Sequence, residues 1–197
     1  MPDSSTADTG RLRGVLGTLP AAAAVLVLIN AMYITLVAIG NITDFHTNLA
    51  FVQHVMSMDT TNFGQPAGVG LDQDVMWRAI DDSTLWHIGY AAIIAAEALA
   101  AVVLIVGLVH FARALFGSAS YDRARRWSSA GLTLIVLIFG GGFIAIGGEW
   151  FQMWRSTTWN GLDSALRYVV LAGLGLVLLH LPDRAWGQPL AISTNRE

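Results

Sequence analysis

Four long apolar segments dominate the chain and leave few folds open to it. Each contains the roughly 20 residues that a helix rising 1.5 Å per residue needs to cross about 30 Å of hydrocarbon. In lipid the backbone must satisfy its own hydrogen bonds, and barrel strands would alternate in polarity over about 10 residues, so continuous segments of this length indicate helices. The predicted membrane spans are approximately residues 16–40, 85–115, 127–154 and 162–181.

The composition agrees with a membrane protein. Of the 197 residues, 54% are hydrophobic and only 13% are charged, and the mean hydropathy is +0.55, which is too apolar for an ordinary soluble surface. We therefore predict an all-α integral membrane four-helix bundle that forms one domain over residues 1–197. The ends of the chain, 1–14 and 188–197, are predicted to be polar tails.

The arginines predict the orientation of this bundle. In a four-span layout eight of them lie on one side of the membrane, and only Arg78, Arg155 and Arg167 lie on the other. The positive-inside rule then puts both termini in the cytoplasm and makes this a multi-pass protein of the cytoplasmic (inner) membrane. Residues 41–84 become a long extracytoplasmic loop.

Short interfacial helices are predicted within this loop. Apolar residues recur at helical spacing between Asp44 and Met58, which indicates an amphipathic helix, and a second short helix is expected around residues 75–80. Trp150, Trp154 and Trp159 lie near the same boundary, as an aromatic belt at the membrane surface would.

The residue inventory excludes several classes of function. Cysteine and lysine are both absent, which removes thiolate metal sites, cysteine nucleophiles and Schiff-base chemistry. The formal net charge of −3 argues against nucleic-acid binding. No hydrolase or nucleotide-binding motif is present, so we predict a protein that is not an enzyme and needs no cofactor.

One carboxyl lies deep in a predicted span. Counting along each helix from its flanking arginine puts Glu97, Asn30 and Tyr168 in a shared intramembrane layer. A charged carboxylate at that depth costs about 3 kcal/mol, so Glu97 is expected to be neutral or hydrogen-bonded. The layer either carries a proton or a small solute, or fixes the register of the helices through hydrogen bonds.

Two further features concern packing between the spans. Glu149 and Arg167 are expected at the same level near the outer face, where an ion pair would join the third and fourth helices. The sequence GGGFIAIGG, at residues 140–148, predicts either a close-packed seam against the alanine-rich second span or a hinge at a binding site.

Weak candidates for metal binding remain. His110 and His180 are expected at matched depths on parallel helices, as axial haem ligands would be. His54, Met56 and Met58 alternate in HVMSM and would share a face suited to Cu(I) if that segment were extended. On the helix that we prefer for this segment they diverge, and packing is then their role.

Several motifs resemble a known family. FVQHVMSMDTT from Phe51, WRAI from Trp77, GGEWFQMW from Gly147 and the intramembrane Glu97 are similar to a bacterial family of predicted small integral membrane proteins, domain of unknown function 2165. MSMD, with Met56, Met58 and Asp59, and WFQMW are the most specific blocks. The resemblance spans residues 25–183 and implies the four-span fold without implying an activity; members commonly have a small or apolar residue where this chain has Glu149.

The predicted function follows from small size, the lack of catalytic motifs and small-residue seams suited to helix contacts. We expect a non-catalytic accessory or assembly subunit of a larger membrane complex, whose partners are the lipid bilayer and either other membrane subunits or further copies of itself. The alternatives are a small proton-coupled transporter or channel centred on Glu97, and a haem-binding electron-transfer anchor.

Overall fold

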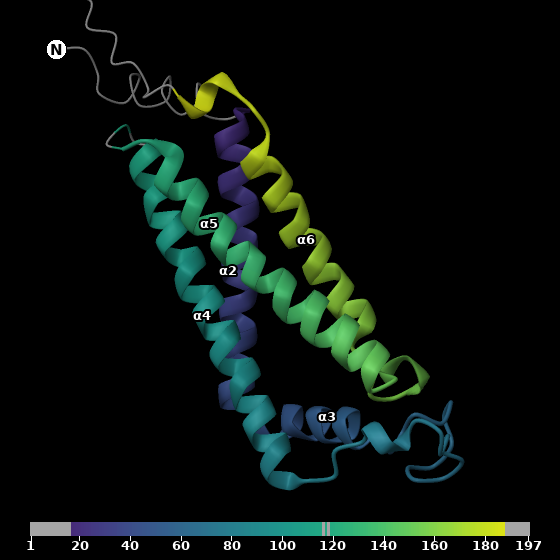
Figure 1. The fold of residues 1–197 in the computed structure, drawn as a ribbon. Helices are drawn as coiled ribbons and strands as arrows, with labels where there is room; N and C mark the ends of the chain where they lie inside the picture. Colours follow the sequence, from purple (N-terminus) through teal and green to yellow (C-terminus); the bar gives the residue numbers. More distant parts are fainter. Residues whose placement is uncertain (1–16, 116, 118, 188–197) are drawn as a thin grey trace, which may run out of the picture.

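The computed structural model describes residues 17–115, 117 and 119–187, and every secondary-structure element in this described part is a helix (Figure 1). Four segments are long and apolar enough to cross a membrane: Leu19–Thr43, Ser83–Leu115, Tyr121–Trp150 and Leu162–His180. The all-α, four-span prediction is confirmed. The predicted tails, 1–14 and 188–197, lie outside the described residues, and the orientation of the termini stays a prediction.

The first two spans are the α-helices α2 (Leu19–Thr43) and α4 (Ser83–Leu115). Thr18 caps α2, since its hydroxyl accepts from the Ala21 N–H at 3.4 Å, and Pro20 suits the first turn because it lacks an N–H. The Asp82 carboxylate accepts from the Thr84 N–H at 2.7 Å at the start of α4. α2 continues three residues beyond its predicted end, and this extension brings Asn41 into the helix.

The third span changes its backbone geometry along its length. It begins as α5 (Tyr121–Val136) and continues as a π-helix, η2 (Leu137–Trp150), which ends where the Phe151 N–H donates to the Ile146 carbonyl at 3.0 Å. It therefore starts six residues before its predicted boundary and ends four residues early. The fourth span is α6 (Leu162–His180), within one residue of its prediction.

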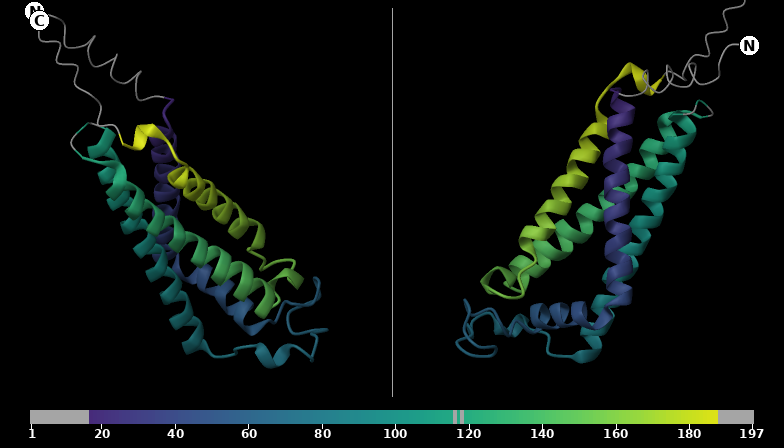
Figure 2. Two further views of the ribbon diagram at one scale, coloured as in Figure 1. Left: turned by 45° about the horizontal axis from the view of Figure 1, so that its top comes forward. Right: turned by 180° about the vertical axis from the view of Figure 1, so that it is seen from behind.

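Two pairs of spans diverge along the bundle. α4 packs against α2 and α5, whereas α6 packs against α2, α5 and η2, so α4 and α6 are not neighbours. Figures 1 and 2 show α5 crossing from α4 toward α6, so that α2 and α4 separate from η2 and α6 at one end. Helix α3 (Phe45–Ser57) lies across the gap at that end. We call this the α3 end, and the opposite one the η4 end, after the short helix η4 (Arg184–Trp186).

Helix α3 confirms the helix predicted over residues 44–58. It ends at Met58, which is fully buried and adopts the left-handed conformation with φ 56°. The Thr61 hydroxyl donates to the Met58 carbonyl at 2.7 Å and stabilises this turn. Two short 3-10 helices, η1 (Met76–Arg78) and η3 (Met153–Arg155), complete the α3 end.

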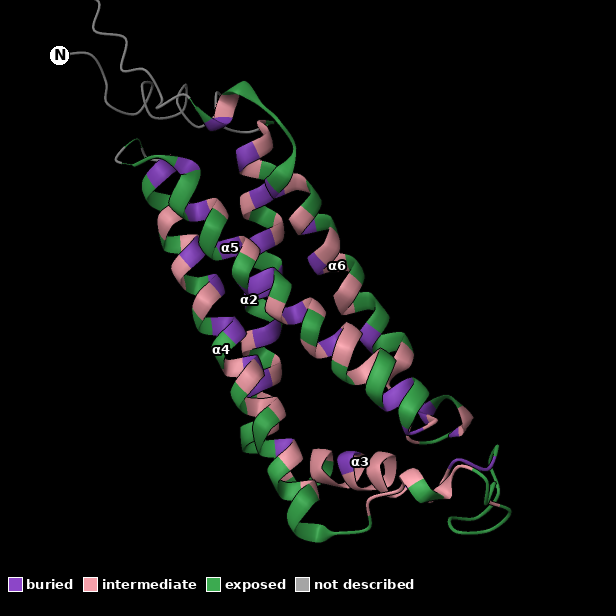
Figure 3. Cartoon of the chain, viewed as in Figure 1, coloured by how far each residue is buried: buried purple, intermediate pink, exposed green. Residues whose placement is uncertain are grey.

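Burial follows the helix contacts rather than a central core. In Figure 3 the buried positions follow the helix faces that point toward neighbouring helices, while positions that point outward from the bundle are exposed. Leu104, Leu132 and Leu179 are fully buried, whereas Leu36 and Leu137 are more than 60% exposed although equally apolar. This pattern is expected where the solvent is hydrocarbon, because exposure of leucine to lipid carries no penalty.

Candidate functional site

A polar cavity lies inside the bundle on the α3 side. It measures about 290 Å³, and all four spans and α3 contribute to its wall. Its polar lining consists of Asn41, Asn48, Tyr90, Glu97, Asn160, Ser164 and Tyr168. Asn160 and Ser164 are exposed at its rim, whereas Glu97 is only 1% exposed.

Glu97 is held by the end of α2. The Asn41 side-chain amide donates to Glu97 Oε2 at 2.7 Å, and the Tyr90 hydroxyl donates to the Asn41 carbonyl at 3.1 Å. These two bonds join the last turn of α2 to α4. Helix α3, which begins only four residues after Asn41, closes the cavity above them.

Asn30 is not part of this site, which corrects the predicted layer. Its amide donates to the Leu26 carbonyl at 2.9 Å and to the Leu171 carbonyl at 3.4 Å, so it joins α2 to α6 closer to the η4 end. The count from arginines misplaced it because Arg13 lies six residues before α2 begins, whereas Arg113 lies inside α4.

Tyr168 lines the cavity together with Glu97. Its ring lies between Tyr33, at a centroid distance of 3.7 Å, and Phe139, at 4.2 Å and 9°. The ring contacts continue from Phe139 through Phe143 to Phe51 of α3. A row of aromatic side chains therefore runs along the cavity from α2 to α3.

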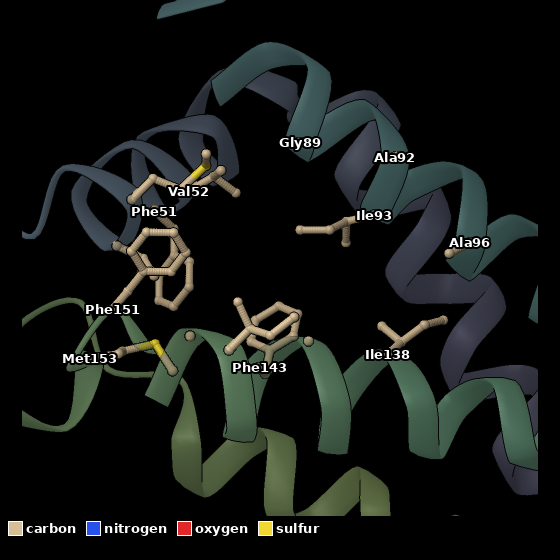
Figure 4. Close-up of a pocket in the computed structure, with 15 residues that line it drawn as sticks. Phe51, Val52, Gly89, Ala92, Ile93, Ala96, Ile138, Phe143, Phe151 and Met153 are labelled. Atoms are coloured by element: carbon tan, nitrogen blue, oxygen red, sulfur yellow. The ribbon is translucent and has the colours of Figure 1, made fainter. Parts of the chain in front are cut away.

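A second, apolar cavity adjoins the polar one. It measures about 380 Å³ and lies between α3, α4 and η2 (Figure 4). Phe51 and Val52 of α3, Ile93 of α4 and Phe143 of η2 line both cavities. These four side chains are the partition between a polar and an apolar compartment.

Gly142 and Gly147 of η2 line this cavity, and the glycines of η2 do not form the predicted seam with α4. A methyl group built on Gly141 or Gly142 would meet no atom within 4 Å. The close approaches occur elsewhere: Gly107 of α4 lies against Ser128, and Gly131 of α5 lies against Leu104. The helix pair that packs closely is therefore α4 and α5, not α4 and η2.

The MSMD motif lies at the end of α3, beside the apolar cavity. His54 Nδ1 lies 2.9 Å from the Asp59 carboxylate, and the His54 ring stacks on Trp159 at 4.5 Å. Met56 lines the apolar cavity and faces Gly89 of α4. Met58 ends the helix, so these residues do not gather as a copper ligand set. In the described part of the chain no group of three or more histidine or acidic side chains could hold a metal ion.

The predicted haem ligands are far from a shared site. His110 lies on α4 and His180 ends α6, and these helices are not neighbours because α2 and α5 lie between them. His180 Nδ1 instead donates to the Leu176 carbonyl of its own helix at 2.8 Å. Parallel direction alone therefore misled the prediction, since it does not establish which helices are adjacent.

The predicted ion pair between Glu149 and Arg167 is also corrected. Both side chains are exposed, and no ion pair joins them in the structure. The arginine that does form a pair is Arg155, whose Nη1 donates to Asp72 Oδ2 at 2.8 Å and ties the long loop to η3. This hydrogen bond, with a second from the Asp74 backbone N–H, holds the pKa of Asp72 below its ordinary value.

The three tryptophans of the predicted belt all lie at the α3 end but differ in their contacts. Trp150 meets Trp77 edge to face at 5.5 Å and carries the Arg78 guanidinium over its ring at 5.3 Å. Trp154 similarly carries Arg155 at 5.1 Å. Trp159 is partly buried under α3, so it supports the cavity and is not a belt residue.

Sequence reasoning missed most of the polar lining. The predicted boundary of the first span puts Asn41 in the long loop. Tyr90, Asn160 and Ser164 are polar residues near the boundary of a span, and Asn48 is a polar residue of the loop helix, with no further signal in the sequence. Asn41 could have been found as a polar residue at the end of an apolar segment antiparallel to the one that contains Glu97.

The comparisons with known proteins agree with this architecture. No curated protein and no solved structure matches the chain. One family model, described as a predicted small integral membrane protein and designated DUF2165, matches residues 19–182. This range includes all four spans, α3 and every residue that lines the two cavities. The chain therefore belongs to the DUF2165 family of predicted small integral membrane proteins.

Proposed function

We propose that this protein binds a small amphipathic molecule inside the membrane, with the polar part of the ligand at Glu97 and its apolar part between α3, α4 and η2. The observation that carries the proposal is a carboxyl that is 1% exposed and borders an open cavity of about 290 Å³. If Glu97 only fixed helix register, neighbouring side chains would be expected to fill the space around it.

The size and chemistry of the two cavities support a ligand. A single water occupies about 30 Å³ of liquid volume, and ligand pockets typically measure about 300–1,000 Å³. The two neighbouring cavities, of about 290 and 380 Å³, fall within or close to this range. Amide, hydroxyl and carboxyl groups on one side, with aliphatic and aromatic groups on the other, suit a molecule with one hydrogen-bonding end.

Packing at the η4 end favours binding over conduction. Beyond Glu97 toward that end the described helix interfaces are packed mainly with buried apolar side chains, among them Ala101, Leu104 and Leu132. The buried polar residues Asn30 and Ser128 lie at different helix pairs, α2 with α6 and α4 with α5, and do not form a continuous polar path. A channel would need polar groups or water along its whole length. We therefore prefer a binding site that opens at the α3 side over the proton-coupled channel or transporter centred on Glu97.

The accessory-subunit role stays a prediction beside this proposal. A ligand site of this kind is compatible with a non-catalytic subunit, and the family model names no catalytic activity. Purification in mild detergent with mass spectrometry of the co-purifying proteins tests it, and a protein that purifies alone as a monomer would contradict it.

The binding proposal is tested with Glu97→Gln. The glutamine carbonyl can still accept from Asn41, so the helix contact is retained while the carboxyl is lost. Organic extracts of the purified wild type are expected to contain a stoichiometric small molecule by mass spectrometry, and Glu97→Gln is expected to lose most of it. Gly142→Leu, which extends a side chain into the apolar cavity, should displace it as well.

Glu149→Gln provides the matched control, because it removes an exposed carboxyl outside both cavities. This variant should retain the extracted molecule at the wild-type ratio. The proposal fails if wild type, Glu97→Gln and Gly142→Leu all yield the same extract, or if the wild-type extract contains bulk membrane lipids only.

A further inference from the structure

A depression lined only by polar and charged residues lies at the η4 end, on the far side of the molecule from Glu97. It measures about 420 Å³ and is lined by Asp122, Arg125, Arg126, Ser129 and His180. The first four recur along one face of α5, and His180 is the last residue of α6. The depression therefore lies where the start of one span meets the end of another.

The Arg125 side chain makes structural contacts within the protein. Its Nε donates to the Leu179 carbonyl at 2.7 Å, and its guanidinium stacks over Trp186 at 4.9 Å. The bond satisfies a carbonyl at the end of α6 that has no partner within the helix. Arg125 thus supplies a fixed positive charge at the wall of the depression.

The side chains of Arg126 and Ser129 make no such contacts among the described residues. Within residues 17–187 as described, neither side chain has a hydrogen bond, and Arg126 has no ion pair or ring contact. His180 uses Nδ1 to bind the Leu176 carbonyl, which leaves its other ring nitrogen without a described partner. Hydrogen-bonding groups of Arg126, Ser129 and His180 therefore line the depression without a described partner.

The charge balance of the depression favours an anion. Two guanidinium groups face one carboxylate, that of Asp122, which also accepts from the Ser120 hydroxyl at 3.4 Å. The start of α5 and the end of α6 meet here, so the two helix dipoles oppose each other and the guanidinium groups carry the charge argument. Arginine suits a phosphate group in particular, because its planar fork can form two parallel hydrogen bonds.

The surroundings of the depression are apolar. Trp127, next to Arg126 on α5, is 43% exposed, and Val177, one turn before His180 on α6, is 56% exposed. An anion bound here would border hydrocarbon along both spans. Of the two sources of a phosphate, a lipid headgroup and free phosphate, only the lipid carries acyl chains that would cover these side chains.

We propose that this depression between α5 and α6 binds the phosphodiester of an anionic phospholipid, with Arg126 and Ser129 as the main donors and Arg125 as a supporting charge. Basic pockets between membrane helices commonly bind anionic headgroups. The site is independent of the proposed ligand cavity, because no residue lines both.

Native mass spectrometry of the delipidated, detergent-solubilised full chain tests the proposal, with phosphatidylglycerol and phosphatidylcholine as the probes. Wild type should bind one phosphatidylglycerol in preference to phosphatidylcholine. Arg126→Gln should weaken phosphatidylglycerol binding about tenfold, the effect of losing one charge-assisted contact. Ser129→Ala should weaken it by a smaller factor.

Arg123→Gln is the matched control, since Arg123 is an exposed arginine of the same helix that does not line the depression. It should leave phosphatidylglycerol binding unchanged. Equal losses in Arg123→Gln and Arg126→Gln would overturn the proposal, because they would indicate general surface charge. If inorganic phosphate alone displaces the lipid, the proposal that the bound phosphate belongs to a lipid is wrong. Circular dichroism spectra verify that each variant is folded.

Discussion

The two ends of the bundle differ in how closely their helices approach. Toward the η4 end the backbone of α4 contacts that of α5: a methyl group on Gly107 would lie 3.0 Å from the Ser128 backbone nitrogen. Toward the α3 end, Gly141 and Gly142 of η2 face open space, and two cavities separate η2 from α4. Gly107 therefore allows a close approach of two helix backbones, whereas Gly142 leaves space for a cavity. Close contacts of glycine at the α3 end, such as Gly148 against Leu162, do not involve α4.

The half toward the η4 end is therefore closely packed, whereas the half toward the α3 end contains the two cavities. In lipid, helices associate through packing because apolar surface gains nothing by leaving hydrocarbon. The closely packed half supplies that contact, while α3 and the aromatic row support the half that does not close. Glu97 lies at the boundary between the halves, and this explains how a buried carboxyl borders an open cavity.

The largest expected effect comes from truncating one leucine of the packed half. Leu104→Ala should lower the free energy of unfolding by about 2–5 kcal/mol, because Leu104 is fully buried between α4 and α5 and leaves a new cavity. Ile93→Ala, on the same helix but half-buried beside existing cavities, should lower it by less, because fewer packing contacts are lost. Unfolding by sodium dodecyl sulfate titration measures both.

Leu99→Ala is the control for this comparison, because Leu99 is 53% exposed on the lipid face of α4. It should be close to neutral. Equal destabilisation by Leu104→Ala and Ile93→Ala would contradict the difference between the two ends, since it would mean that the cavity walls are as tightly packed as the α4–α5 contact.

A smaller effect is expected from adding a methyl group at a glycine. Gly107→Ala should destabilise the protein by about 1–3 kcal/mol through overpacking against Ser128. Gly141→Ala should be neutral, because the new methyl group meets nothing within 4 Å. The same unfolding titration tests both.

Ser128→Ala sharpens this prediction. The buried Ser128 hydroxyl has no hydrogen-bond partner, so its removal should not destabilise the protein, and combining it with Gly107→Ala should recover part of the lost stability. Strictly additive effects of the two substitutions would argue against a direct contact.

The helices of the fold could be predicted because a segment that crosses hydrocarbon must be long enough to span it and must satisfy its backbone hydrogen bonds internally. The four helices agree with the predicted ranges to within about six residues, and α3 follows from apolar residues at helical spacing. The resemblance to the family, carried by MSMD and WFQMW, is confirmed by the family model.

The contacts of the site could not be predicted, because they depend on register and adjacency. Asn41 is the α2 residue that contacts Glu97, and Asn30 lies eleven residues, about three turns, before it, a difference that the count from flanking arginines conceals. The sequence also does not state which helices are adjacent. For this reason it predicted wrong neighbours for the glycines of η2 and for the pair His110 and His180.

The smallest expected effect concerns the long loop at the α3 end and depends on pH. The Asp72 carboxylate accepts from Arg155, and the Phe63 N–H donates to the Arg155 carbonyl at 3.0 Å, so Arg155 holds the loop at two points. Because Arg155 lowers the pKa of Asp72 in the folded state, the stabilisation is complete above the ordinary aspartate pKa of about 4. It is lost as the pH falls through the lowered value.

Hydrogen–deuterium exchange of residues 62–76, corrected for the intrinsic pH dependence of exchange, should therefore reveal faster exchange in acid than at neutral pH. Asp72→Asn should exchange faster at neutral pH and lose the acid-dependent step, whereas Asp74→Asn, a matched loss of charge in the same loop, should behave as wild type. The four spans should be unaffected, because their hydrogen bonds do not involve this loop. If Asp74→Asn has the same effect as Asp72→Asn, the loop responds to its total charge and not to the contact with Arg155.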